Sequence, residues 1–120
     1  MQKLAKREEQ IMQAAWHLGK AFIKEIIAEL PDPKPHYNSV ATMVRILEDK
    51  GFLAHETFGN TFRYYPAITK EQYQKHAFGD IVRQYFNNSY PSMLAYFAKE
   101  HSMSQEELNE ILEIIKSQKK

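Results

Sequence analysis

Polar side chains recur at helical spacing in residues 38–53, which read NSVATMVRILEDKGFL. One side of a helix drawn through this segment carries Asn38, Thr42, Arg45 and Asp49, with Ser39 and Ala41 at its edges. Amide, hydroxyl and guanidinium groups can hydrogen-bond to base edges, and small side chains allow close approach to the major groove. The pattern therefore predicts a DNA-reading helix, although an ordinary solvent-exposed helix would show the same spacing.

The elements around this face favour the first interpretation. The opposite side carries an apolar stripe at i, i+3, i+4 and i+7, made of Val40, Met43, Val44 and Leu47. Lys50 and Gly51 supply a cation and a glycine for the helix end. Residues 52–58 and 61–66 then predict two strands, joined at Gly59-Asn60 by a tight turn. A helix followed by such a hairpin is the second half of a winged helix-turn-helix domain.

Further donors flank the predicted recognition helix. Lys34, His36 and Tyr37 lie in or just after a proline-rich connector, where phosphates would pass. Each could donate a hydrogen bond to a phosphate oxygen, or could simply be solvated. Arg63 is the best-placed cation of the hairpin, and its alternative role is to pair with Glu56 across the strands.

The N-terminal residues predict two more helices, over residues 4–18 and 20–30. Gly19 separates them, and the prolines from Pro31 onward end the second. Trp16 is the only tryptophan of the chain, and we expect it to anchor the core between helices.

The C-terminal residues predict three short amphipathic helices. Capping boxes at Thr69/Gln72 and Ser104/Glu107 mark two of the helix starts. Three such helices expose more apolar surface than they can cover among themselves, so we predict burial against a second copy. The expected dimerisation residues are Tyr73, Ile81, Tyr85, Leu94, Phe97, Leu108, Ile111, Leu112 and Ile115. The predicted fold is mainly α with a small β-wing: a winged-helix DNA-binding domain over residues 1–68 and a helical dimerisation region over residues 69–120.

The composition is that of a soluble globular chain. The 120 residues are 43% hydrophobic and 26% charged, and no apolar run of about 18 residues is available to cross a membrane. The first ten residues lack the apolar segment of a secretion signal, so we expect a cytoplasmic protein. The net charge of +1 gives no general basic field for nucleic acid, which leaves local phosphate contacts to supply affinity.

The sequence predicts no cofactor, no metal site and no enzymatic activity. The chain has no cysteine, which excludes disulfides, thiolate zinc sites and cysteine nucleophiles. His76 and Asp80 are spaced as an i, i+4 pair, but no third ligand or nucleophile lies near them in sequence. The stronger alternative to DNA binding is a winged-helix module that binds another protein, which the low net charge would suit.

Three stretches together resemble the penicillinase and methicillin-resistance repressor family, BlaI/MecI/CopY, over nearly the whole chain. They are EQIMQAAW at residues 9–16, the pattern SVAT with Arg45, Leu47 and KGFL at residues 39–53, and YYP at residues 64–66. The resemblance implies a winged-helix homodimer that represses transcription from a palindromic operator in double-stranded DNA. It places base and phosphate contacts on Asn38, Ser39, Ala41 and Thr42, and the wing at residues 59–63.

Two departures from the family pattern affect specificity and release. Ala41 stands where relatives often carry a longer side chain, which implies a different operator sequence. Family members that are released by a membrane-bound sensor protease are cut at an Asn-Phe bond, and the matching candidate cleavage pair here is Tyr96-Phe97. The copper-responsive branch carries a cysteine-rich motif, which this chain lacks.

Overall fold

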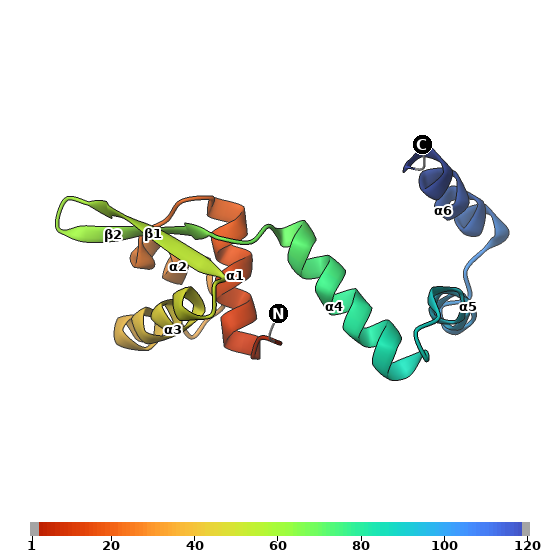
Figure 1. Ribbon diagram of the computed structural model, residues 1–120, viewed down its shortest axis with the longest axis horizontal. Coiled ribbons are helices and arrows are strands. Elements are labelled where there is room, and N and C mark those ends of the chain that lie inside the picture. The colour runs from red at the N-terminus through yellow and green to blue at the C-terminus, as the bar shows by residue number, and fades with distance from the viewer. Residues whose placement is uncertain (1–2, 119–120) are drawn as a thin grey trace. The chain divides into compact units, whose positions relative to one another are not determined.

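The computed structural model describes residues 3–118, apart from the side chains of Ile115 and Gln118. The elements run in the order α1 (Lys6–Leu18), α2 (Ile23–Glu29), α3 (Tyr37–Asp49), β1 (Leu53–Phe58), β2 (Thr61–Pro66), α4 (Lys70–Tyr85), α5 (Tyr90–Glu100) and α6 (Gln105–Gln118) (Figure 1). Three helices followed by an antiparallel hairpin make a winged helix-turn-helix arrangement. The predicted fold class, mainly α with a small β-wing, is thus confirmed.

The chain divides into two compact units, Met1–Ala77 and Phe78–Lys120. The first unit contains α1, α2, α3, the hairpin and the first half of α4. The second unit begins within α4 and contains α5 and α6.

The core of the first unit collects one apolar face from each helix. The stripe predicted for α3 is buried: Val40, Val44 and Leu47 are each 0% exposed, and Met43 packs against them from the edge. The facing residues of the other elements are Ile11, Met12, Ala15, Ile26, Leu30, Leu53 and Tyr64. Burial of this face fixes which side of α3 points outward, since side chains that share the helical period share a side.

The hairpin is a regular antiparallel pair whose register places His55 opposite Tyr64 and Glu56 opposite Arg63. Gly59 takes a φ of +62° in the turn, a conformation that glycine adopts readily. In the view of Figure 1 the turn extends beyond the helices at the base of the hairpin.

A short extended segment before α2 pairs with the hairpin through one β-bridge. Ala21 and Tyr64 exchange both backbone hydrogen bonds, each with an N···O distance of 2.8 Å. The helix predicted from residue 20 therefore begins only at Ile23. Pairing with β2 satisfies the N–H of Ala21, which a helix start would have left open.

The start of α4 belongs to the first unit. The Thr69/Gln72 capping box forms as predicted, with both reciprocal hydrogen bonds present. Trp16 donates its indole N–H to the carbonyl of Ile68 at 3.0 Å, which ties α1 to the segment before α4. Tyr73 is only 8% exposed and its ring contacts the rings of Trp16 and Phe52. Tyr73, which the sequence placed at a dimer contact, is a core residue of the first unit in this structure.

The second unit has a sparse core of its own. Val82 of α4 is fully buried, and the ring of Phe86 lies 5.7 Å from that of Tyr96 in α5. Asn87 and Asn88 both take positive φ and separate α4 from α5. Ser89 caps α5 by accepting from the N–H of Ser92, and Ser104 and Glu107 form the predicted capping box of α6.

Candidate nucleic-acid interface

The outward face of α3 carries most of the predicted base-reading residues. Asn38, Ser39, Thr42 and Arg45 are all exposed, and Ala41 is half-buried at the edge of the face. Because the buried stripe holds the helix against the core, these side chains are presented together from a rigid support. The face is therefore suited to enter a groove of matching width.

The first turn of α3 is open to an anion. His36 stands at the N-cap without a side-chain hydrogen bond to the helix, and the first turn contains no acidic residue. By contrast, α1, α2, α4 and α6 each carry glutamate in the first turn. Free backbone N–H groups and the positive end of the helix dipole together favour a phosphate at this position. Exposed His36 and Tyr37 lie beside the same turn, where both can donate to a phosphate.

The structure limits how Thr42 can read a base. Its hydroxyl donates to the carbonyl of Asn38 one turn earlier, at 2.9 Å. While this bond is kept, the hydroxyl can only accept a hydrogen bond from DNA, and its methyl group is available for a thymine methyl. Asn38 and Ser39 each offer both a donor and an acceptor from one side chain, and only the Asn38 amide offers them on two separate atoms.

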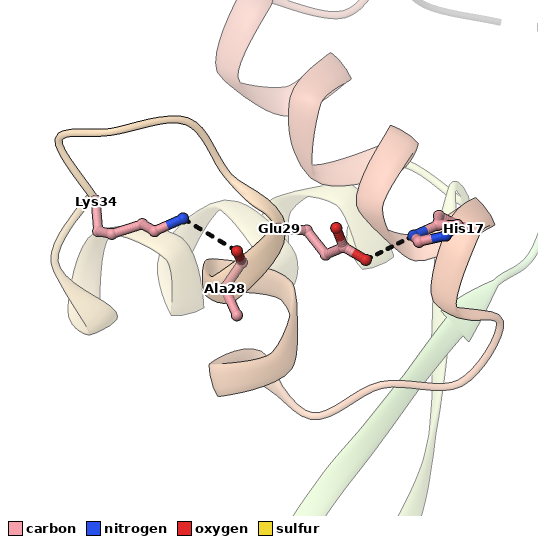
Figure 2. A network of polar contacts seen from close by, with 4 residues as sticks. All are labelled: His17, Ala28, Glu29 and Lys34. Carbon is pink, nitrogen blue, oxygen red and sulfur yellow. Dashed lines mark hydrogen bonds and ion pairs between the residues drawn. The ribbon is translucent and has the colours of Figure 1, made fainter.

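Lys34 has an internal partner that its sequence position did not predict. Its ammonium donates to the carbonyl of Ala28 at 3.0 Å and also to that of Leu30, at the C-terminal end of α2. Figure 2 shows the side chain turned back toward Ala28. The nearby pair of His17 and Glu29, 2.5 Å apart, joins α1 to α2 (Figure 2). Lys34 thus satisfies carbonyls that the helix end leaves open.

Arg63 lies on the outer face of the hairpin, with Phe22 of the extended segment. Its guanidinium carbon is 5.7 Å from the ring centroid of Phe22 and 5.8 Å from that of Phe58. Glu56, its partner in the register, instead accepts from Lys20 at 3.3 Å. Arg63 is therefore held by aromatic rings through cation–π contacts. The sequence offered an ion pair between Arg63 and Glu56 as the alternative, but in the structure Glu56 pairs with Lys20.

The inner face of the hairpin turns toward α3 and carries a cluster that the sequence did not single out. His55 lies 2.5 Å from Glu48 of α3, measured from Nδ1 to Oε2, and its ring stacks on that of Phe62. Burial raises the pKa of Tyr64 above its usual value of 10.0, and the nearby charge of Glu48 raises it further. Alternation along the strands could have indicated that His55 and Tyr64 share a face, but not that α3 ends beside them.

The second unit leaves apolar side chains exposed on all three helices. Tyr85 is 74% exposed, and the exposed set also includes Phe78, Ile81, Tyr90, Leu94, Phe97, Leu112 and Ile114. A cavity of about 440 Å³ between α5 and α6 is lined by Leu94, Phe97, Ala98, Met103, Leu108, Ile111 and Leu112. Most of the expected dimerisation residues thus belong to this surface, and the side chain of Ile115 lies outside the described residues.

The candidate cleavage pair lies inside α5, where Tyr96 and Phe97 are 58% and 52% exposed. The ring of Phe97 also contacts His101 at the end of the same helix, with centroids 4.3 Å apart. The peptide bond between Tyr96 and Phe97 is therefore part of a helix in this structure.

The chain is similar to known repressors over most of its length. The family model described as penicillinase repressor matches residues 4–117. The penicillinase repressor of Bacillus licheniformis is 27% identical over 122 residues, covering 98% of this chain and 92% of that protein. A solved CopR repressor structure is 30% identical to this chain and has a TM-score of 0.46; the match covers 54% of this chain and 96% of the CopR chain.

Among the residues that the structure describes, no helix is long and apolar enough to cross a membrane. The chain belongs to the penicillinase repressor family, whose members are transcriptional repressors and not enzymes.

Proposed function

We propose that this repressor binds double-stranded operator DNA as a homodimer and reads a palindromic site. The observation that carries the proposal is the exposed polar face of α3 together with its open first turn. One surface thus offers side chains for base edges and a helix end for a phosphate.

The proposed contacts follow from the exposure of each residue. Asn38, Ser39, Ala41, Thr42 and Arg45 enter the major groove, and His36 and Tyr37 bind the phosphates beside it. The hairpin, with Arg63, follows the adjacent backbone. Phosphate contacts set position and affinity, whereas the α3 face sets sequence preference.

The exposed apolar surface of α4, α5 and α6 supports the homodimer. Burial of exposed aromatic side chains such as Tyr85, Tyr96 and Phe97 against another apolar surface would lower the free energy. A second copy of the same segment would offer a self-complementary surface, as two-fold dimers require. Two recognition helices related by that axis would then read half-sites about one helical turn apart, or a multiple of that distance.

We propose that the repressor is cytoplasmic and that it is released from DNA by cleavage between Tyr96 and Phe97. The partner that makes this cut would be a membrane-bound sensor protease. Cleavage would divide α5 and separate α6 from α4, which divides the proposed dimer surface. A protease needs an extended substrate, so α5 must open locally before it is cut. Mass spectrometry after incubation with such a protease would identify the cut.

Selection of bound duplexes from a random double-stranded library tests the function. We expect an enriched palindrome, a complex with two protomers per duplex in sedimentation, and affinity that falls steeply with added salt. Failure to enrich any sequence at low ionic strength would overturn the proposal and favour a protein-binding module instead.

A further inference from the structure

The outer half of the hairpin has few backbone contacts to hold its direction. The extended segment pairs with β2 only at Ala21–Tyr64, near the base of the hairpin. Beyond it, residues 57–62 are all exposed and belong to an isolated two-stranded ribbon. Such ribbons are marginally stable in water, so side-chain contacts must set the direction of this one.

Two side-chain clusters supply these contacts, one on each face. The outer cluster consists of Phe22, Phe58 and Arg63, and ties the hairpin to the segment before α2. The inner cluster consists of Glu48, His55 and Phe62, and ties the hairpin to the last turn of α3. Of these two clusters, the inner one is the one that includes a residue of α3.

His55 is the central residue of the inner cluster. Its Nδ1 is 2.5 Å from a carboxylate oxygen of Glu48, and because an ionised carboxylate only accepts, Nδ1 is the donor. Its ring lies 4.2 Å from that of Phe62 at an interplanar angle of 28°, and 5.7 Å from that of Tyr64. Glu48 and His55 side chains are 28% and 32% exposed, so their bond is partly shielded from water.

We infer that His55 is a positioning residue, which sets the direction of the hairpin relative to α3 through Glu48 and Phe62. This inference rests on the proposed function, because only DNA binding gives that direction a role. The segment from His55 to Gly59 spans roughly 14 Å at about 3.4 Å per residue. A rotation of about 10° at His55 would therefore move the turn by roughly 2 Å, enough to break a hydrogen bond to a phosphate.

The test uses variants that remove one contact at a time. Glu48→Ala removes the hydrogen bond, and Glu48→Gln keeps an acceptor for Nδ1 without the charge. His55→Phe removes the hydrogen bond but keeps a ring to stack on Phe62. Asp49→Ala is the matched control, since it also removes one negative charge from the end of α3 and Asp49 is exposed. The outer cluster is unaltered in every variant, so the hairpin stays paired.

Residual dipolar couplings of the backbone amides in the full chain, without DNA, report the direction of the hairpin against α3. We expect Glu48→Ala and His55→Phe to change the hairpin couplings relative to those of α3, and Glu48→Gln and Asp49→Ala to retain the wild-type pattern. Unchanged couplings in both Glu48→Ala and His55→Phe would overturn the inference. This readout is independent of DNA, so it decides the inference even if no duplex is enriched.

With the duplex enriched by selection, the same variants test the consequence for binding. Glu48→Ala and His55→Phe should each weaken binding about 5- to 10-fold, and the double variant no more than either. Hydroxyl-radical footprints should lose protection of the backbone beside the hairpin and keep protection in the α3 groove. Loss of both protected regions together, with a lowered Tm, would indicate a general folding role and contradict a positioning role.

Discussion

Lys50 at the end of α3 and Glu8 in the first turn of α1 form an ion pair, with Nζ 2.9 Å from Oε2. The two side chains are 26% and 13% exposed, so the pair is shielded from solvent. Glu8 also accepts from the backbone N–H of Ala5 at 3.0 Å. This backbone hydrogen bond, with a smaller effect of Lys50, lowers the pKa of Glu8 below its usual 4.5. The C-terminal end of α3 is thus attached to the first turn of α1.

The lowered pKa of Glu8 predicts a pH-dependent stability. Because the folded pKa is below the unfolded one, the stabilisation is complete above about pH 4.5 and is lost as pH falls through the folded pKa. Glu8→Gln should lower the free energy of unfolding by about 1 kcal/mol at pH 7, with a smaller difference at pH 3. Denaturant melts at both pH values measure this. Exposed Glu9→Gln is the matched control, and an equal loss in both variants would contradict the assignment.

Gly51 gives a test of backbone conformation alone. Its φ is +86°, and a Cβ at this position would meet no atom within 4 Å. Gly51→Ala should therefore cost about 1 to 2 kcal/mol through the unfavourable φ and not through a clash. Denaturant unfolding of the variant gives the value. A cost near zero would show that the turn after α3 accepts another conformation.

Asn38 and Arg63 should have different roles in DNA binding. Asn38→Ala should cost about 1 to 3 kcal/mol on the selected duplex and relax base preference, because Asn38 lies on the α3 face. Arg63→Ala should weaken all sequences alike and reduce the slope of log affinity against log salt by about 0.9. Fluorescence anisotropy titrations over a salt series measure both effects. If Arg63→Ala altered sequence preference at an unchanged slope, the two roles would be assigned wrongly.

Leu94 and Tyr73 should separate association from folding. Leu94 is exposed beside the α5–α6 cavity, so Leu94→Glu should shift the proposed dimer to monomer in sedimentation and leave the first unit folded. Tyr73 is buried in the first unit, so Tyr73→Ala should instead cost about 3 to 5 kcal/mol of its stability, as truncation of a large core aromatic does. Analytical ultracentrifugation and thermal melts measure the two effects. A monomeric wild-type chain at micromolar concentration would refute the proposed dimer.

Local sequence patterns predicted the elements well. The stripe from Val40 to Leu47 predicted the buried side of α3, and Gly59-Asn60 predicted the hairpin turn. The capping boxes at Thr69 and Ser104 formed where their residue types indicated. These features depend on residues within a few positions of one another, so a single chain segment contains the information.

Contacts between side chains and backbone groups of different segments could not be predicted from the sequence alone. Tyr73 has the periodicity of a dimer-facing residue, yet it joins Trp16 and Phe52 in the first core. Ala21 falls in the helix predicted over residues 20–30, yet its backbone pairs with Tyr64. Lys34 and Arg63 look like free cations, yet one caps α2 and the other lies between aromatic rings. Tyr73, Ala21 and Arg63 have partners in segments far away along the chain, so no local spacing specifies them. The carbonyls that Lys34 binds are only six and four residues away, but the sequence alone did not show that the side chain turns back toward them.

The sequence by itself determined which side of α3 is buried, where the hairpin turns, and hence that a polar face of α3 is exposed. Only the tertiary structure decided which polar groups remain available on that surface, and how the hairpin is held beside the helix. The physical reason is that amphipathic periods are fixed by local backbone geometry, whereas a charged group such as Glu48 or Lys50 acquires its partner only when the packed core brings separate segments within hydrogen-bonding distance.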